Sequence, residues 1–433
     1  MEREPETPET DSSERESPFQ KKPLELSSVD RILSDEAFPE GGARAWMVAI
    51  GAGAALFSTM GYANAFGVYQ EYYQEHQLRD ETPSAISWIG SLQMFMIFAS
   101  GVISGPLFDR YGEKIIWPSS IIYIFAVMMT SICKSLWQFV LAQGILGGFT
   151  MGMILGPSMT ATSHYFKKNR AAAMGIIVAA SSAGGVVFPI ALSKMFNNRR
   201  LGFEWTVRIC GFMILALLTI TCVGIKARLP PRKERFLLPE AFKQLPYTAL
   251  IASVFLMLLG LFIPFFYLPT YAIEHGMSVG LASYLVSILN AASFFGRVIP
   301  GILADRLGRF NMLFASALSA GILIFCWPKT STNASIIVFS TLYGFCSGAI
   351  VSLSSVCLMS IPEDPRDIGT YYGMAFFIVS IAALVGPPIN GALVTLYGGF
   401  EEAAIFSGVA VTTGALGVVV TKQTLGKGMF ARL

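Results

Sequence analysis

The segment GPLFDRYG at residues 105–112 recurs 196 residues later as GILADRLG at residues 301–308. Two glycines four residues apart, Gly148 and Gly152, recur at the same offset as Gly344 and Gly348. Glycines at this spacing let membrane helices approach closely because they carry no side chain. Two matches at one offset predict a chain built from two similar halves, an arrangement typical of membrane transporters.

The composition around this repeat is that of a membrane protein. Of 433 residues, 53% are apolar or aromatic and only 14% are charged, whereas soluble domains carry about 25% charged residues. A net charge of +3 with no basic stripe argues against nucleic-acid binding. The cysteines and histidines lack metal-ligand spacing, and the chain has no P-loop, no H-E-x-x-H and no pair of aspartates within its apolar runs. We therefore expect no metal, no cofactor, no obligatory protein partner and no enzymatic activity.

Twelve mostly apolar runs follow Arg44, each long enough to cross about 30 Å of hydrocarbon. They predict an all-α membrane protein with transmembrane helices at 45–69, 84–107, 115–133, 137–163, 171–194, 205–225, 247–273, 279–303, 310–328, 335–358, 368–390 and 401–421. With the N-terminus inside, the cytoplasmic loops hold 14 basic residues and the outer loops six. The positive-inside rule therefore places both termini in the cytoplasm.

The chain divides into four expected regions. Residues 1–40 hold 12 acidic and 5 basic residues with almost no apolar periodicity, which predicts a disordered acidic cytoplasmic tail. Residues 41–225 and 247–433 are expected to form two six-helix bundles. Residues 226–246, rich in proline and basic residues, are expected to form a cytoplasmic linker, and this basic segment equally fits a surface for anionic lipid headgroups.

The repeated G-x-L-x-D-R-x-G element resembles the loop signature of the major facilitator superfamily. The resemblance implies two six-helix bundles around a central cavity, with alternating access by rocking. It also implies that Asp109 and Asp305 lie at helix ends and hold the cytoplasmic side closed through charge and helix-dipole contacts, with Arg110 and Arg306 as partners. The alternative is that these residues only mark a solvated turn.

Three further segments resemble the monocarboxylate porter family, and in particular its fungal branch. They are EGGARAW at 40–46, HYFKKNRA at 164–171 and SILNAASFFGR at 287–297. The resemblance aligns Arg297 with the arginine that binds the substrate carboxylate in animal monocarboxylate carriers. The alternative is an arginine that extends to the interface or ties helices together.

Two positions depart from the proton-coupled pattern of those carriers. The family's aspartate, four residues before the arginine, is Ser293 here, and its lysine in the first span is Asn64. Neither side chain titrates near neutral pH, so we expect a larger and more neutral substrate recognised by stacking and hydrogen bonds. Residues 262–271 contain an aromatic cluster that fits such recognition. The candidate substrate-binding residues are Arg297, Asn64, Ser293, Asn290, Tyr267 and Tyr271.

These features predict a transporter of a small organic molecule in the cell membrane, in contact with membrane lipid. Efflux of a fungal secondary metabolite is the first interpretation. Uptake of a monocarboxylate or vitamin-like nutrient with a coupling proton is the second, and a nutrient sensor that does not transport is the third. The sequon at Asn333 falls in an expected external loop, which makes it a candidate N-glycosylation site.

Overall fold

The structure is a computed structural model that describes residues 38–196, 198, 200–230 and 236–426. These residues form helices and connecting turns, with no β-strand among them. In the first half the helices are α2 (Gly42–Ser58), α3 (Met60–Ala63), α4 (Phe66–Glu75), α5 (Pro83–Ala99), α6 (Gly101–Tyr111), α7 (Ile116–Thr130), α8 (Leu136–Phe139), α9 (Gly148–Ser163), α10 (Arg170–Phe196) and α11 (Gly202–Gly224). A π-helical segment, Val140–Gly147, joins α8 to α9.

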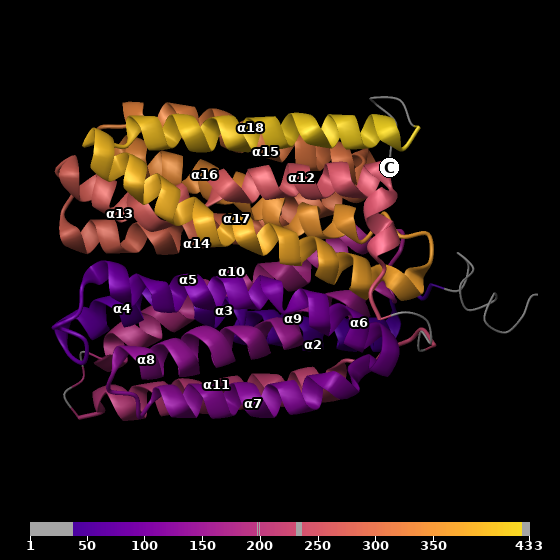
Figure 1. Ribbon diagram of the computed structural model, residues 1–433, viewed down its shortest axis with the longest axis horizontal. Helices are drawn as coiled ribbons and strands as arrows, with labels where there is room; N and C mark the ends of the chain where they lie inside the picture. Colours follow the sequence, from indigo (N-terminus) through magenta and orange to yellow (C-terminus); the bar gives the residue numbers. More distant parts are fainter. Residues whose placement is uncertain (1–37, 197, 199, 231–235, 427–433) are drawn as a thin grey trace, which may run out of the picture.

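The second half begins after a short 3₁₀ turn at Pro239–Lys243. Its helices are α12 (Leu245–Leu261), α13 (Ile263–Glu274), α14 (Val279–Leu307), α15 (Arg309–Cys326), α16 (Asn333–Leu358), α17 (Ile368–Tyr397) and α18 (Glu401–Thr424). Figure 1 shows the helices of the first half gathered in the lower part of the molecule and those of the second half in the upper part. The chain leaves α18 at the right-hand end of this view.

Eleven helical stretches of the described chain are long and apolar enough to cross a membrane, where the sequence predicts twelve. The difference lies at Ala85–Thr130, a single stretch of 46 residues that contains α5, α6 and α7. At 1.5 Å per residue it would measure ~69 Å if straight, more than twice the thickness of the hydrocarbon layer. The chain instead leaves the α-helix at Gly112, where φ is 64°, and α7 starts after a 3₁₀ turn.

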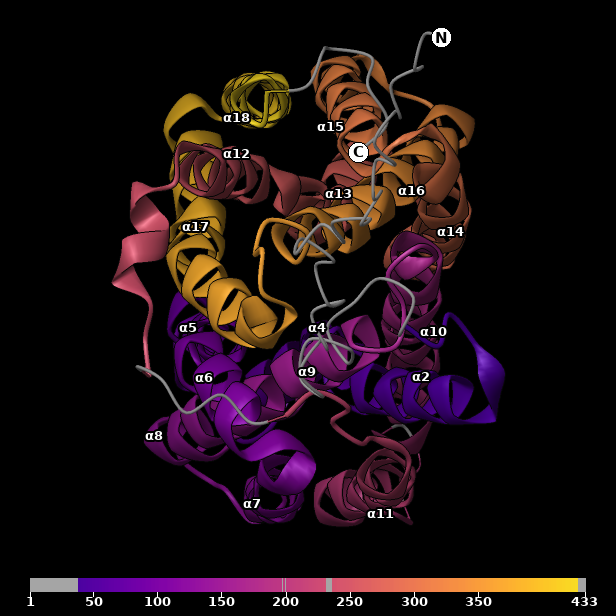
Figure 2. The ribbon, with the colours of Figure 1, turned by 90° about the vertical axis from the view of Figure 1, so that its right-hand side faces the viewer.

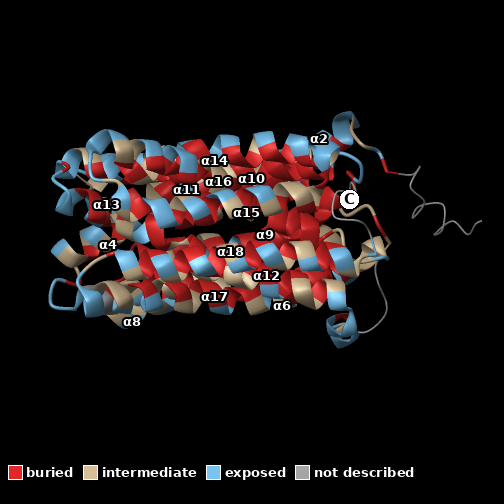
Figure 3. Cartoon of the chain, turned by 90° about the horizontal axis from the view of Figure 1, so that it is seen from above, coloured by how far each residue is buried: buried red, intermediate tan, exposed pale blue. Residues whose placement is uncertain are grey.

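The outer surface of the helices is apolar, which fits a protein surrounded by lipid. Figure 3 shows the buried residues lining the interior and the exposed ones on the outside. Large side chains such as Ile121, Phe125 and Phe212 are more than half exposed on that outside. Such a surface would be unfavourable in water. In a bilayer it faces lipid chains, and the helices satisfy their own backbone hydrogen bonds.

The two halves touch through glycines. A Cβ on Gly105 of α6 would collide with the carbonyl oxygen of Gly369 in α17, and one on Gly175 of α10 would collide with the carbonyl oxygen of Arg297 in α14. Figure 2, viewed along the helices, shows α10 beside α14 at this boundary. The absence of side chains at these glycines therefore lets the halves meet backbone to backbone.

The predicted tail falls almost entirely on residues 1–37, which lie outside the described residues. Its last three residues, Phe38–Glu40, differ from the prediction because they pack against the folded body. Phe38 is buried, and Glu40 binds backbone N–H groups between α9 and α10. The three hydrogen bonds to the Glu40 carboxylate offset the entropy lost when these residues become ordered, a contribution that composition alone does not reveal.

Candidate substrate cavity

A cavity of about 1280 Å³ lies between the two halves. It reaches the surface where Glu71 and Leu396, which is 76% exposed, line it, and we call this the open end of the molecule. Its deep part is lined by Arg297, only 7% exposed, and by Ser354, Ser355 and Tyr372. The opposite end, where Asp109 and Asp305 lie, is the closed end.

Arg297 both lines the cavity and ties two helices together. Its Nη1 donates hydrogen bonds to the backbone oxygen of Val178 at 2.8 Å and to the hydroxyl of Ser181, both in α10. Its Nε has no hydrogen-bond partner, and within the described part of the chain no carboxylate forms an ion pair with it. A buried guanidinium held in place but not neutralised is suited to bind an anionic or strongly accepting group.

Asn64 and Asn290 also line the cavity. They come from different halves and both lie close to Gly185 of α10, where an added Cβ would be 2.9 Å from Nδ2 of Asn64 and 3.3 Å from Oδ1 of Asn290. Ser293, in contrast, does not line the cavity. It is 1% exposed and receives a 3.5 Å hydrogen bond from Ser182, so this structure does not place its side chain at the cavity.

Of the two tyrosines predicted to bind substrate, only Tyr267 lines the cavity. Its hydroxyl donates to the backbone oxygen of Pro387 at 3.4 Å. Tyr271 is 2% exposed, and its hydroxyl donates to the backbone oxygens of Trp327 and Thr330, outside the cavity. Tyr267 and Tyr271 are four residues apart, a spacing that predicts one shared face of the helix. In the structure Tyr271 nevertheless packs against Trp327 and does not reach the cavity.

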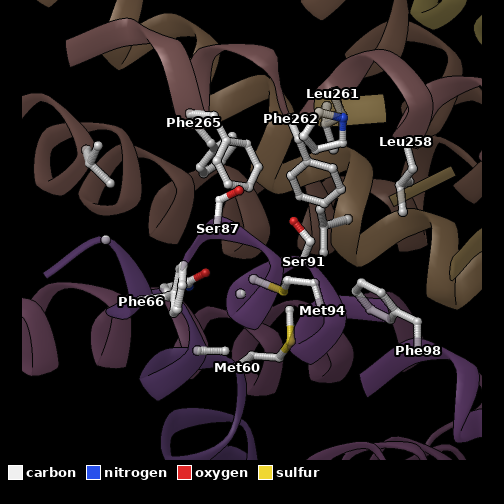
Figure 4. Close-up of a pocket in the computed structure, with 18 of the residues that line it drawn as sticks. Met60, Phe66, Ser87, Ser91, Met94, Phe98, Leu258, Leu261, Phe262 and Phe265 are labelled. Carbon is white, nitrogen blue, oxygen red and sulfur yellow. The ribbon is translucent and has the colours of Figure 1, made fainter. Parts of the chain in front are cut away.

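Figure 4 shows the cavity walls. Phe262 and Phe265 extend from the second half towards Ser87 and Ser91 on α5 of the first half. The first half also contributes side chains that were not expected from the sequence, namely Met60, Phe66, Met94 and Phe98. No sequence signal marks them, because an apolar residue within an apolar span reads the same whether it faces a cavity or lipid.

The two repeated aspartates lie at the closed end, where each binds the start of a helix from the other half. Asp109 accepts hydrogen bonds from the N–H of Thr370 (2.6 Å) and from its hydroxyl (2.7 Å) at the start of α17. Asp305 accepts from the N–H groups of Ala171 (3.0 Å) and Ala172 (2.8 Å) at the start of α10. A carboxylate at a helix N-terminus is stabilised by the unpaired N–H groups and the helix dipole.

The predicted partners of these aspartates are wrong. Arg110 and Arg306 are exposed, and Arg110 lies over the ring of Tyr111. Consecutive residues on a helix point about 100° apart, so neither arginine can face the carboxylate beside it. Asp305 instead pairs at 3.6 Å with Arg309, the first residue of α15, across the turn at Gly308.

Two remaining features lie at opposite ends of the molecule. At the closed end, His164 is buried. Its burial is the main cause that lowers the pKa of the imidazole to about 3, and the positive charges of Arg170 and Arg228 lower the pKa further. At the open end, Asn333 is exposed at the start of α16, where Thr332 and Ser335 cap the helix. Within the described residues, no group of three His, Cys, Asp or Glu side chains is arranged to hold a metal ion.

Similar proteins agree with this architecture. The aspyridones efflux protein apdF of Emericella nidulans is 54% identical over 398 residues, which cover 91% of this chain and 82% of that protein. The agnestins efflux protein AgnL12 of Paecilomyces divaricatus is 40% identical over 414 residues, covering 94% and 93%. In fold, the chain is similar to the proton:xylose symporter XylE, with a TM-score of 0.71 at 12% identity, covering 86% of this chain and 95% of that one.

The sequence profile of the Major Facilitator Superfamily matches residues 47–387. That range includes both copies of the Asp-Arg turn and most of the cavity wall. The helical body with its many apolar stretches is therefore a multi-pass membrane protein, and the chain belongs to the major facilitator superfamily.

Proposed function

We propose that this protein exports a fungal secondary metabolite across the cell membrane by alternating access. The cavity carries the proposal: it is large, walled by aromatic and methionine side chains, and has one unneutralised arginine at depth. Relatives named as efflux proteins for aspyridones and for agnestins support the direction of transport. The absence of an ionisable side chain at Ser293 and Asn64 favours a metabolite over a small monocarboxylate.

The topology proposed for this function has twelve spans in two six-helix bundles, with residues 41–225 and 247–433 as the halves. The 46-residue stretch at Ala85–Thr130 then crosses the membrane twice, with its turn at Gly112. The closed end and both termini face the cytoplasm, so the cavity opens outward. The segment at 287–297 supports membership of the fungal branch of monocarboxylate porters. In this proposal the protein shares ancestry with those porters but transports a different substrate.

The substrate proposed for this cavity has an extended apolar or aromatic body and one group that accepts hydrogen bonds strongly. The body lies between Phe262 and Phe265 on one side and Met94 and Phe98 on the other. Aromatic pairs at such walls contribute about 0.5–1.5 kcal/mol beyond the burial of area. The accepting group binds Arg297.

A strain that lacks the gene provides the first test. We expect one metabolite to accumulate in the cells and to fall in the medium, and the wild-type gene to restore export. Export by Arg297→Gln is expected to be about 10- to 100-fold slower, since a hydrogen bond to a charged group contributes about 1.5–3 kcal/mol. Arg208→Gln is the matched control, because Arg208 pairs with Glu204 away from the cavity.

Purified protein in liposomes separates the alternatives. Counterflow of labelled lactate and pyruvate is followed with and without an imposed proton gradient, for wild type and Arg297→Gln. The proposal predicts no gradient-driven movement of either compound. Such movement, abolished by the substitution, would contradict export of a metabolite and favour proton-coupled uptake. Unchanged metabolite levels in the deletion strain would favour a sensor that does not transport.

A further inference from the structure

One peptide group at the closed end lies between two charged side chains from opposite halves. The carboxylate of Glu40 accepts hydrogen bonds from the backbone N–H groups of Lys167 (2.6 Å), Lys168 (2.5 Å) and Asn169 (3.0 Å). The carbonyl oxygen of Lys167 accepts from Nη2 of Arg309 at 2.6 Å. That carbonyl and the N–H of Lys168 belong to the same peptide group. A carboxylate therefore binds one side of this group and a guanidinium binds the other.

The backbone around Glu40 is shaped for this contact. Glu40 is the one non-glycine residue in the described ranges with a positive φ, at 47°. Gly41 and Gly42, which follow it, have φ values of 153° and 82° and so supply the conformations that a side chain would disfavour. The N–H of Glu40 donates to the backbone oxygen of Tyr165 at 3.1 Å. An unfavourable φ persists only where surrounding contacts hold it, and here those contacts are the amides between α9 and α10.

Arg309 is held from the other side by residues of the second half. Its Nη1 donates to the hydroxyl of Ser360 at 3.1 Å, and its Nη2 lies 3.6 Å from the carboxylate of Asp305. These two contacts come from the second half itself, and they hold the guanidinium in the position from which it binds the Lys167 carbonyl. Hydrogen bonds in a chain polarise one another, so a carboxylate on the N–H side strengthens the acceptor on the C=O side.

We infer that Glu40 is a positioning residue for closure of the cytoplasmic end. It holds the peptide group between Lys167 and Lys168 so that Arg309 binds the carbonyl when the halves meet. Glu40 and this peptide group lie in the same half and stay together, whereas the bond to Arg309 breaks when the halves part. The inference assumes alternating access at this end but involves no substrate. A failure of metabolite export would therefore leave it standing, and its own failure would leave the export proposal standing.

A distance measurement across the closed end tests the inference. Spin labels are placed at Tyr111→Cys and Leu307→Cys, both exposed positions on opposite halves, in a protein whose native cysteines are replaced by serine. Glu40→Gln is expected to raise the ratio of open to closed molecules about three- to tenfold, a typical coupling for residues in one network. Glu113→Gln is the matched control, because its carboxylate binds Ala227 and Lys226 without reaching the second half. We expect it to leave the ratio unchanged.

Coupling between Glu40 and Arg309 decides the outcome. Arg309→Gln alone is expected to open the cytoplasmic end, and adding Glu40→Gln to it should change the ratio little further. If Glu40→Gln has the same effect with and without Arg309, the two residues act independently and the inference is wrong. Glu40→Asp keeps the charge but withdraws it from the three amides, so it should also open this end. An unchanged ratio in Glu40→Asp would overturn the inference even if the glutamine variant does not fold.

Discussion

His164, between α9 and α10, is the residue at which we expect acid to destabilise the protein. It is 3% exposed, and neither ring nitrogen has a hydrogen-bond partner. Burial, assisted by Arg170 and Arg228, lowers its pKa from 6.5 to about 3. Below pH 6.5 the unfolded chain therefore binds a proton that the folded protein does not. The stability tied to neutral His164 is complete above pH 6.5 and is lost as the pH falls towards 3, at up to about 1.4 kcal/mol per pH unit.

The measurement compares melting temperatures in detergent at pH 7.5 and pH 5.5 for wild type and His164→Gln. Between these values the wild type should lose about 1.4 kcal/mol more stability than the variant. His76→Gln, which replaces an exposed histidine at the open end, is the control and should behave like wild type. Parallel pH curves for wild type and His164→Gln would contradict the prediction, because they would show that folding does not lower the pKa of this imidazole.

At the scale of elements, α6 and α17 should respond to added bulk by moving apart. A Cβ on Gly105 would collide with Gly369 in the other half, whereas one on Gly152 would collide with Ile97 and Ser100 in the same half. Overpacking costs about 1–3 kcal/mol. In Gly105→Ala this cost falls only on the closed state, so the ratio of open to closed molecules should rise roughly 5- to 150-fold. In Gly152→Ala the overpacking cost destabilises the folded protein in both states, so the melting temperature should drop and the ratio should stay the same.

Both quantities are measured on both variants, with the spin-labelled pair at Tyr111 and Leu307 for the ratio and a thermal melt for stability. Each glycine variant thereby serves as the control for the other. Equal losses of stability with no change in the ratio would show that the α6–α17 contact does not separate during transport. The same contact would then be static packing, as it is for Gly152.

The sequence predicts these elements better than it predicts their contacts. The repeat at 105–112 and 301–308 identifies the superfamily, since two copies at one offset are improbable by chance, and the superfamily profile confirms it. The backbone partners of Asp109 and Asp305 were not predictable, because these N–H groups lie more than a hundred residues away in the chain. Backbone groups carry no residue identity, so no pattern in the sequence marks them.

At the scale of the whole molecule, the number of spans decides where the two ends of the chain lie. An odd number places the termini on opposite sides of the membrane, and an even number places them on the same side. The 11 apolar stretches found among the described residues include one, Ala85–Thr130, that is long enough to cross twice. The proposed twelve crossings would put the start of α2 and the end of α18 on the same side as the basic loops, a side that the positive-inside rule predicts to be the cytoplasm.

A membrane-impermeant maleimide applied to intact cells tests this topology. In a background without native cysteines, Lys329→Cys at the open end should react, and Lys114→Cys at the closed end should react only after permeabilisation. Epitope tags at both termini should likewise need permeabilisation. If Asn333 carries a glycan, Asn333→Gln will remove the mass shift caused by the glycosidase, as an external position requires. A single tag exposed on intact cells would establish an odd number of spans, and the reverse labelling pattern would turn the open cavity towards the cytoplasm.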